Sequence, residues 1–190
     1  MTAVTLNLDA VTTLTHEQFW QLSLTNRDIR LELTAQGELI VMPPTGWESG
    51  KHNANLTTDL NIWTRKANTG VAFDSSTGFT LPNGAVRSPD VAWVASERLI
   101  ALNPDPEGFL PLAPDFVIEL RSATDRLKPL QEKMREYQAN GVRLGWLLNP
   151  QDHTVEIYRA GKEVEVLKSP KSLSGEDVLP GFVLELEGIL

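Results

Sequence analysis

The chain has 190 residues, 41% of them hydrophobic, which is enough to bury a core and suits one compact domain over residues 1–190. It has no cysteine, which excludes disulfides and thiolate metal sites and leaves oxygen or imidazole ligands for any metal. The formal net charge of −8 argues against tight, non-specific DNA binding and against an anionic membrane surface as a partner.

The sequence contains no membrane-spanning signal. No apolar run approaches the roughly 18 residues that a spanning helix needs. The N-terminal residues lack the charged start and apolar block of a secretory signal. Together with the absence of cysteine, these features favour a cytoplasmic protein.

In chain order, the first elements are an arm, a short helix, a hairpin and a long helix. Thr15-His16-Glu17-Gln18 has the pattern of a capping box, and alternating apolar residues on either side of Ala35-Gln36-Gly37 indicate a hairpin. The expected ranges are a flexible arm at 1–10, a helix from Thr15 to about Leu22, strands at 30–34 and 38–41, and a helix at 49–66 that ends at Asn68-Thr69-Gly70.

The rest of the chain alternates between short strands and turns, with one further helix. That helix has Pro129 in its first turn and runs to Asn140, with Gly141 as its terminator. Strands are expected at 71–74, 79–81, 86–94, 115–121, 142–148, 154–159, 164–168 and 182–186. This order predicts a single α/β or α+β domain with a central mixed β-sheet and two main flanking helices.

Two of these strands carry a carboxylate among apolar neighbours, Asp90 in the first and Glu119 in the second. Burying a carboxylate costs free energy unless its charge is compensated, and a divalent cation is one such compensator. Strand alternation places Asp90 on one face with Ala92 and Val94, and Glu119 on one face with Arg121. If the two strands pair, both carboxylates reach one Mg²⁺ or Mn²⁺ ion.

The following helix adds a cation on its apolar side. Lys133 stands at helical spacing with Leu130, Met134 and Tyr137, where a solvated lysine is not expected. An inward Lys133 would be held by the carboxylates of the two strands.

The order of these features resembles the PD-(D/E)xK nuclease superfamily, and more closely its Uma-type branch of restriction-endonuclease-like proteins. The single motifs are short, and the specificity lies in their order and spacing from Glu32 to Phe182. The matching landmarks are Glu32-Leu33, Gly37-Glu38-Leu39, Met42-Pro43-Pro44, His52, Arg87 to Val91, Pro114-Asp115, Glu119, Ser122, Lys133, Tyr137, Gly141-Val142, Trp146, Asn149-Pro150 and Leu179 to Phe182.

The resemblance implies a restriction-endonuclease-like core and magnesium-dependent hydrolysis of phosphodiester bonds in DNA. It gives Asp90 and Glu119 the role of metal ligands. The superfamily's lysine belongs at position 121, where this chain has Arg121, which cannot act as a base and is suited to hold phosphate. Lys133 would then supply the missing ammonium in space. An N-terminal carboxylate often completes such sites, and Glu32 and Glu48 are both candidates.

Other interpretations stay open from the sequence. The chain is either an endonuclease or a non-catalytic binding module that keeps the fold, and an enzyme acting on another phosphate-containing substrate is a third possibility. His52 is interpreted as a surface or capping residue, and the tryptophans as core or interface aromatics rather than base-stacking platforms. A homodimer is expected, formed through the apolar C-terminal segment around Phe182, Val183 and Leu184.

Overall fold

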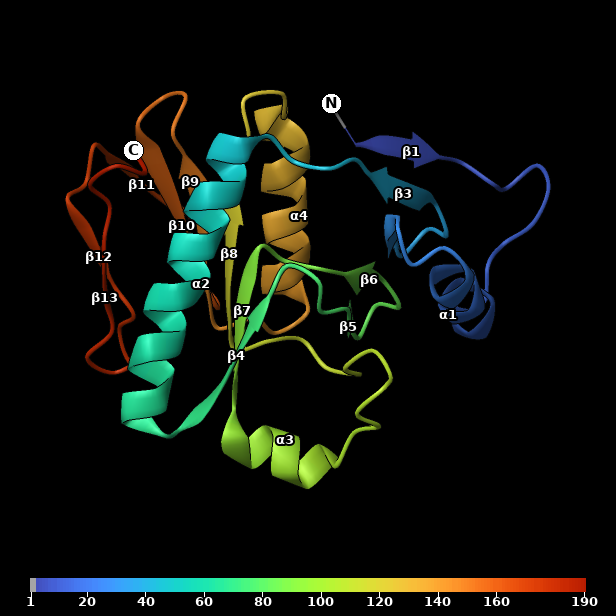
Figure 1. Ribbon diagram of the computed structural model, residues 1–190, viewed down its shortest axis with the longest axis horizontal. Coiled ribbons are helices and arrows are strands. Elements are labelled where there is room, and N and C mark those ends of the chain that lie inside the picture. Colours follow the sequence, from blue (N-terminus) through green and yellow to red (C-terminus); the bar gives the residue numbers. More distant parts are fainter. Residues whose placement is uncertain (1–2) are drawn as a thin grey trace.

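A six-stranded mixed sheet forms the centre of the fold in the computed structural model, which describes residues 3–190 (Figure 1). Its strand order is β11-β10-β9-β8-β7-β4, and only β8 and β9 are parallel neighbours. The strands are β4 (Gly70–Asp74), β7 (Val91–Ala95), β8 (Phe116–Leu120), β9 (Leu144–Asn149), β10 (Thr154–Arg159) and β11 (Glu165–Lys168).

The two longest helices cover opposite faces of this sheet. They are α2 (Trp47–Ala67) and α4 (Leu127–Ala139), and Figure 1 shows both running alongside the strands. Leu56 and Leu60 of α2 pack against one face, which presents Phe116, Ile118 and Trp146. The core on the other face joins Met134 and Tyr137 of α4 to Ala92, Val117 and Leu147. The alternation expected for β8 and the mixed sheet flanked by helices are confirmed.

A second, smaller sheet lies beside the first, in the order β1-β3-β2-β6-β5. Its strands are β1 (Val4–Leu6), β2 (Arg30–Leu33), β3 (Leu39–Met42), β5 (Phe79–Thr80) and β6 (Val86–Arg87). Helix α1 (His16–Thr25) starts with the expected capping box, and its Phe19 packs against Leu33, Leu39 and Val86. A flexible arm was expected at residues 1–10; residues 1–2 lie outside the described residues, and Val4–Leu6 form an edge strand paired with β3.

The segment expected as one strand at 86–94 is two strands in different sheets. Val86–Arg87 belongs to the smaller sheet and Val91–Ala95 to the central one. Pro89 lies between them and has no N–H to donate to a ladder, which explains the break. This one segment therefore brings Arg87 from the smaller sheet and Asp90, just before β7 of the central sheet, to the same cleft.

Two further elements were not expected from the sequence, helix α3 (Ser96–Leu102) and strand β12 (Ser172–Ser174). Helix α3 has no fully buried residue, so its helical pattern is weak. Strand β12 pairs with β13 (Val183–Glu185), which lies within the strand expected at 182–186, and Phe182 and Leu184 are buried in the core on the α2 face. Within residues 3–190, each helix is too short or too polar to span a bilayer.

Candidate functional site

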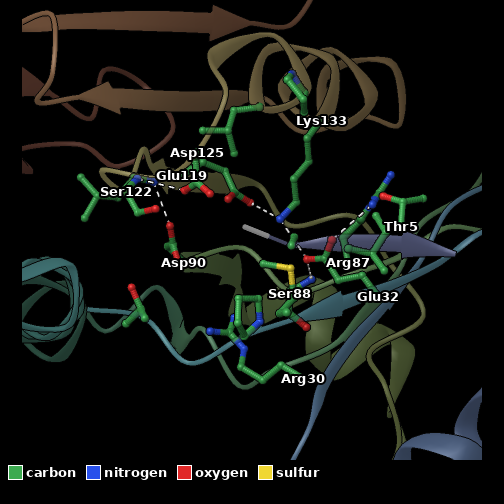
Figure 2. A pocket seen from close by; sticks show the side chains of 18 of the residues that line it. Thr5, Arg30, Glu32, Arg87, Ser88, Asp90, Glu119, Ser122, Asp125 and Lys133 are labelled. Carbon is green, nitrogen blue, oxygen red and sulfur yellow. Dashed lines mark hydrogen bonds and ion pairs between the residues drawn. The ribbon is translucent and has the colours of Figure 1, made fainter. Parts of the chain in front are cut away.

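A cleft of about 690 Å³ opens between the two sheets. One wall is the polar face of the smaller sheet, which presents Arg30 and Glu32 from β2 and Arg87 from β6. The opposite wall is formed by the facing ends of β7 and β8 and by α4 (Figure 2). The cleft therefore gathers charged side chains from both sheets and from the helix between β8 and β9.

Asp90 and Glu119 lie opposite each other at this end of the central sheet. β7 pairs antiparallel with β8, with Val91 across from Ile118, so the next pair outward is Asp90 and Glu119. Asp90 is tied to β8 directly, since the Leu120 N–H donates to its Oδ2 at 2.8 Å. The Asn53 amide of α2 donates to Oδ1 at 3.0 Å. Pairing of the two strands, on which the shared-cation hypothesis depended, is present.

Lys133 reaches from α4 into the space between the two sheets, as Figure 2 shows. Its Nζ lies 2.8 Å from Glu119 Oε1 and 2.9 Å from Glu32 Oε1. Burial alone would lower the pKa of Lys133, but the attraction of Glu119 and Glu32 outweighs it and holds that pKa well above its usual value. Lys133 is therefore a fixed cation rather than a proton acceptor.

Glu32 is held by three donors. Besides Lys133, Arg87 Nη1 donates to Oε2 at 3.2 Å and the Ser88 N–H donates to Oε1 at 3.0 Å. Burial works to raise the pKa of Glu32, but Lys133 and Arg87 overcome it, so the pKa is lowered. Arg87 also donates to Glu136 at 2.6 Å. Glu32 thus acts as an anchor for the two buried cations.

The pKa of Glu119 is shifted in the opposite direction to the pKa of Glu32. Burial raises its pKa, Lys133 opposes the shift, and the nearby charges of Asp90 and Glu32 add to it, which brings the pKa of Glu119 to about 7. Burial also raises the pKa of Asp90, despite the bond from Leu120. Tyr137 donates to Glu119 Oε1 at 3.0 Å. The positive charge near Asp90 and Glu119 is therefore too small to offset the effect of their burial.

A charge count explains that shortage. The mostly buried cluster holds four carboxylates against two cations, which leaves two surplus negative charges when every group is ionised. The carboxylates are Glu32, Asp90, Glu119 and Glu136, and the cations are Arg87 and Lys133. One divalent cation beside Asp90 and Glu119 would balance the cluster.

The donor set at this point fits such a cation. Mg²⁺ usually takes one or two protein carboxylates and keeps its other positions for water or phosphate, and Asp90 and Glu119 supply two. Asn53 Oδ1, also in the cleft, is buried without a hydrogen-bond partner among residues 3–190, and an amide oxygen suits a hard cation. Within the same residues, no group of three or more histidine, cysteine or acidic side chains is arranged to hold a metal by itself.

The other sequence candidates lie elsewhere. Arg121 does not line the cleft, because its guanidinium turns to Asn149 at 3.1 Å and Asp152 at 2.9 Å. Glu48 is exposed in the first turn of α2 and is not part of the cleft wall. Of the two N-terminal carboxylates left open by the sequence, the structure brings Glu32 to the site and leaves Glu48 outside.

Sequence reasoning did not assign several residues that the structure brings into this region. Arg87 and Tyr137 were only landmarks, although a charge in an apolar strand and a tyrosine one turn after Lys133 were visible signals. Asn53 gave no signal. His52 was interpreted as a surface or capping residue, but it is buried, with Nδ1 lacking a partner in the described chain. Trp47, grouped with core or interface aromatics, is 80% exposed.

Both helices at the cleft begin without a side-chain cap. The N-caps are Gly46 for α2 and Arg126 for α4, and both residues line the cleft. This differs from α1, whose Thr15 and Gln18 cap its N-terminus. The first N–H groups of a helix favour anions, so both helix starts suit a negatively charged ligand.

A central mixed sheet flanked by helices, with acidic strand ends beside a buried lysine, defines a nuclease-like α/β protein. The chain matches the Uma2 family, described as "Putative restriction endonuclease", over residues 16–187, and it belongs to that family. The fold and family expected from the sequence motifs are therefore confirmed.

A solved structure supports the fold independently. The chain is similar to the crystal structure of a "putative nuclease belonging to DUF820" from Anabaena variabilis, with 20% sequence identity and a TM-score of 0.77. The similarity covers 92% of this chain and 96% of the other. No curated protein matches the chain.

Proposed function

We propose that this protein is a metal-dependent endonuclease that hydrolyses phosphodiester bonds in DNA. One observation carries the proposal: Asp90 and Glu119 are neighbouring carboxylates with raised pKa values, in a cleft whose buried charges are two positive charges short. A structural ion-pair network would be expected to balance its charges, whereas a site that binds a divalent cation keeps an excess of carboxylates.

Each residue then has a defined role. Asp90 and Glu119 would hold Mg²⁺ or Mn²⁺, and Asn53 and the Leu120 N–H fix the orientation of Asp90. Such an ion would supply Lewis-acid polarisation of the phosphodiester and would lower the pKa of a water molecule. Lys133, kept protonated by Glu32 and Glu119, stabilises the negative charge that develops on the phosphate.

Arg121 has no part in this mechanism. Its guanidinium donates to Asn149 and Asp152, and its Nε donates to the Asp125 carbonyl at 3.2 Å in the loop before α4. The ammonium that the superfamily places at this position comes instead from Lys133, which contacts Glu119 directly. Arg121 in place of the superfamily's lysine is thus compatible with the proposed nuclease activity.

A cleavage assay tests the proposal. Plasmid and single-stranded DNA are incubated with Mg²⁺ or Mn²⁺ and the wild type, Asp90→Asn or Glu119→Gln. Both variants should lose at least about 100-fold in rate, the size of effect seen when one charge-stabilising group is removed. Glu48→Gln, outside the cleft, is the matched control and should cleave like the wild type. Equal cleavage by all four proteins would remove the assigned site.

The second candidate function is a non-catalytic binding module that retains the nuclease fold. It is favoured by the net charge of −8, which opposes association with a polyanion. Calorimetric titration separates the two functions: the endonuclease binds Mg²⁺ or Mn²⁺ at millimolar concentration through Asp90 and Glu119, and the module binds neither.

We also propose a homodimer, the state expected from the sequence. The expected contact surface is reduced by the structure, since Phe182 and Leu184 are buried in the chain's own core while Val183 remains 55% exposed. In the C-terminal half of the chain, Val183 on β13 and Val166 on the edge strand β11 remain exposed and could contact a partner copy. Light scattering that shows only the 21.0 kDa species would contradict the dimer.

A further inference from the structure

Trp47 is an exposed aromatic side chain at the edge of the cleft. It is the first residue of α2, and its neighbours Gly46 and Ser49 line the cleft. Its side chain is 80% exposed and makes no ring contact or hydrogen bond with the described residues. The other four tryptophans are buried or partly buried, as Trp63 is against Trp93 and Phe182. The fold therefore does not explain the position of Trp47.

Arg126 is a basic residue of the cleft that has no polar partner among residues 3–190. Four basic residues line the described cleft: Arg30, Arg87, Arg126 and Lys133. Arg87 and Lys133 are neutralised by buried carboxylates, and Arg30 donates to the Ser75 carbonyl at 2.7 Å. The exposed guanidinium of Arg126 makes no hydrogen bond or ion pair within residues 3–190.

We infer that the cleft binds a single strand of nucleic acid, with a base stacked on Trp47 and a backbone phosphate paired with Arg126. This inference rests on the proposed endonuclease function and names the substrate form that the site takes. Both residues stand at helix starts that line the same cleft, one at α2 and one at α4 (Figure 1). An aromatic face and a nearby cation are the two elements from which single-strand sites are built.

The chemistry of the cleft favours a single strand over a duplex. A duplex hides the faces of its bases in the stack, so Trp47 has no base face to cover. Duplex DNA also carries twice the phosphate charge of a single strand, which is unfavourable for a chain with a net charge of −8. The cleft volume of about 690 Å³ lies in the range of small-ligand pockets and suits a short stretch of one strand.

Fluorescence anisotropy of a short labelled oligodeoxynucleotide tests the inference without cleavage, with Ca²⁺ in place of Mg²⁺ and the probe checked for integrity on a gel. Trp47→Ala should weaken single-strand binding about 10- to 100-fold, the range for loss of one base–aromatic stack, while Trp47→Phe retains most of the affinity. A blunt duplex should bind more weakly than the single strand to the wild type.

Salt dependence tests the phosphate contact separately. Arg126→Ala should flatten the slope of log K against log [salt] by about 0.7, the value for one lost contact on a single strand, whereas Trp47→Ala leaves the slope unchanged. Arg65→Ala, an exposed arginine in the last turn of α2, is the matched control and should not change the slope.

The outcomes distinguish this inference from the proposed function. Binding that depends on Trp47 and Arg126, without cleavage in Mg²⁺ or Mn²⁺, supports the single-strand site and contradicts the endonuclease. Cleavage with unchanged binding by Trp47→Ala overturns the single-strand site alone. Absence of binding by the wild type, preference for the duplex, or an effect of Trp47→Ala only on oligomeric mass would also overturn it.

Discussion

The two faces of the central sheet have opposite characters although they share the same strands. The face under α2 is closed by apolar side chains such as Leu60, Ile118 and Trp146, all fully buried. The face under α4 contains Glu119, Lys133 and Tyr137, joined by hydrogen bonds and ion pairs. Ile118 and Glu119 are adjacent in sequence and point to different faces. Strand alternation thus separates residues that stabilise the fold from residues proposed to do chemistry.

The largest effect on stability is expected on the α2 face. The ring of Trp146 meets the ring of Phe116 edge-on, with 4.8 Å between ring centroids, and stacks on the ring of Phe182, with 6.0 Å between centroids. Trp146→Ala should reduce the free energy of unfolding by about 3–5 kcal/mol, because it removes this contact area and leaves a cavity. Chemical denaturation measures the loss, and Mg²⁺ affinity of the folded fraction should stay unchanged.

If Trp146→Ala does not fold, Ile118→Val is the milder variant on the same face and should cost about 0.5–1.5 kcal/mol. Reduced Mg²⁺ affinity in a folded variant of the α2 face would show that the two faces are coupled, and the separation argued above would be wrong.

A comparable loss is expected on the α4 face for a different reason. Lys133→Met removes the cation shared by Glu32 and Glu119 and leaves both carboxylates buried without it. Breaking a buried pair from one side should cost about 3 kcal/mol and, under the proposed mechanism, also abolish cleavage. The double variant Lys133→Met, Glu119→Gln should recover part of the stability without recovering activity. A double-mutant cycle that shows no coupling would contradict this assignment.

The two faces of the central sheet could be predicted from sequence because they depend on local patterns. The alternation of Phe116, Ile118 and Leu120 identified β8 and its two faces, and the helical spacing of Lys133 and Tyr137 placed Lys133 inward. The order of the motifs along the chain indicated the family and the fold. Helix α3, which was not expected, has no fully buried residue and therefore gives only a weak periodic signal.

The details of the site depend on long-range geometry that local patterns do not contain. Glu32 and Glu48 were equivalent in the sequence, and only the packing of the smaller sheet places Glu32 against Lys133. Arg121 was expected on the face of Glu119, but the chain leaves the strand after Leu120 and Asp152 captures the guanidinium. Trp47 was grouped with the core or interface aromatics because sequence does not reveal whether the start of a helix is covered.

Metal binding should produce a smaller stabilisation, and only through the α4 face. An ion that binds the folded state stabilises it by about 2.7 kcal/mol when its free concentration is 100 times the dissociation constant. Mg²⁺ should therefore raise the melting temperature of the wild type and of Glu48→Gln, and chelation should reverse the shift. Asp90→Asn should lose most of it. A shift that is equal in Asp90→Asn would place the ion elsewhere.

The smallest effect is a pH dependence of the metal-free protein that belongs to the α4 face alone. The pKa of Glu119 is about 7 in the folded state, against 4.5 as its ordinary value, so the folded state binds the proton more tightly. This contribution to stability is complete below about pH 4.5 and is lost as the pH rises through about 7. Between about pH 6 and pH 8 the loss should be roughly 1 kcal/mol.

Denaturation at several pH values, with chelator present, measures this loss, and comparison with Glu119→Gln isolates it. That variant should be less sensitive to pH over this range, because the amide does not titrate, whereas Ile118→Val should follow the wild-type profile at lower stability. Glu32 contributes with the opposite sign, since its pKa is lowered: its stabilisation is present above its ordinary pKa and disappears in acid. If Glu119→Gln and the wild type lose stability equally, the surplus charge is not at Glu119, and the metal site argued from that surplus loses its basis.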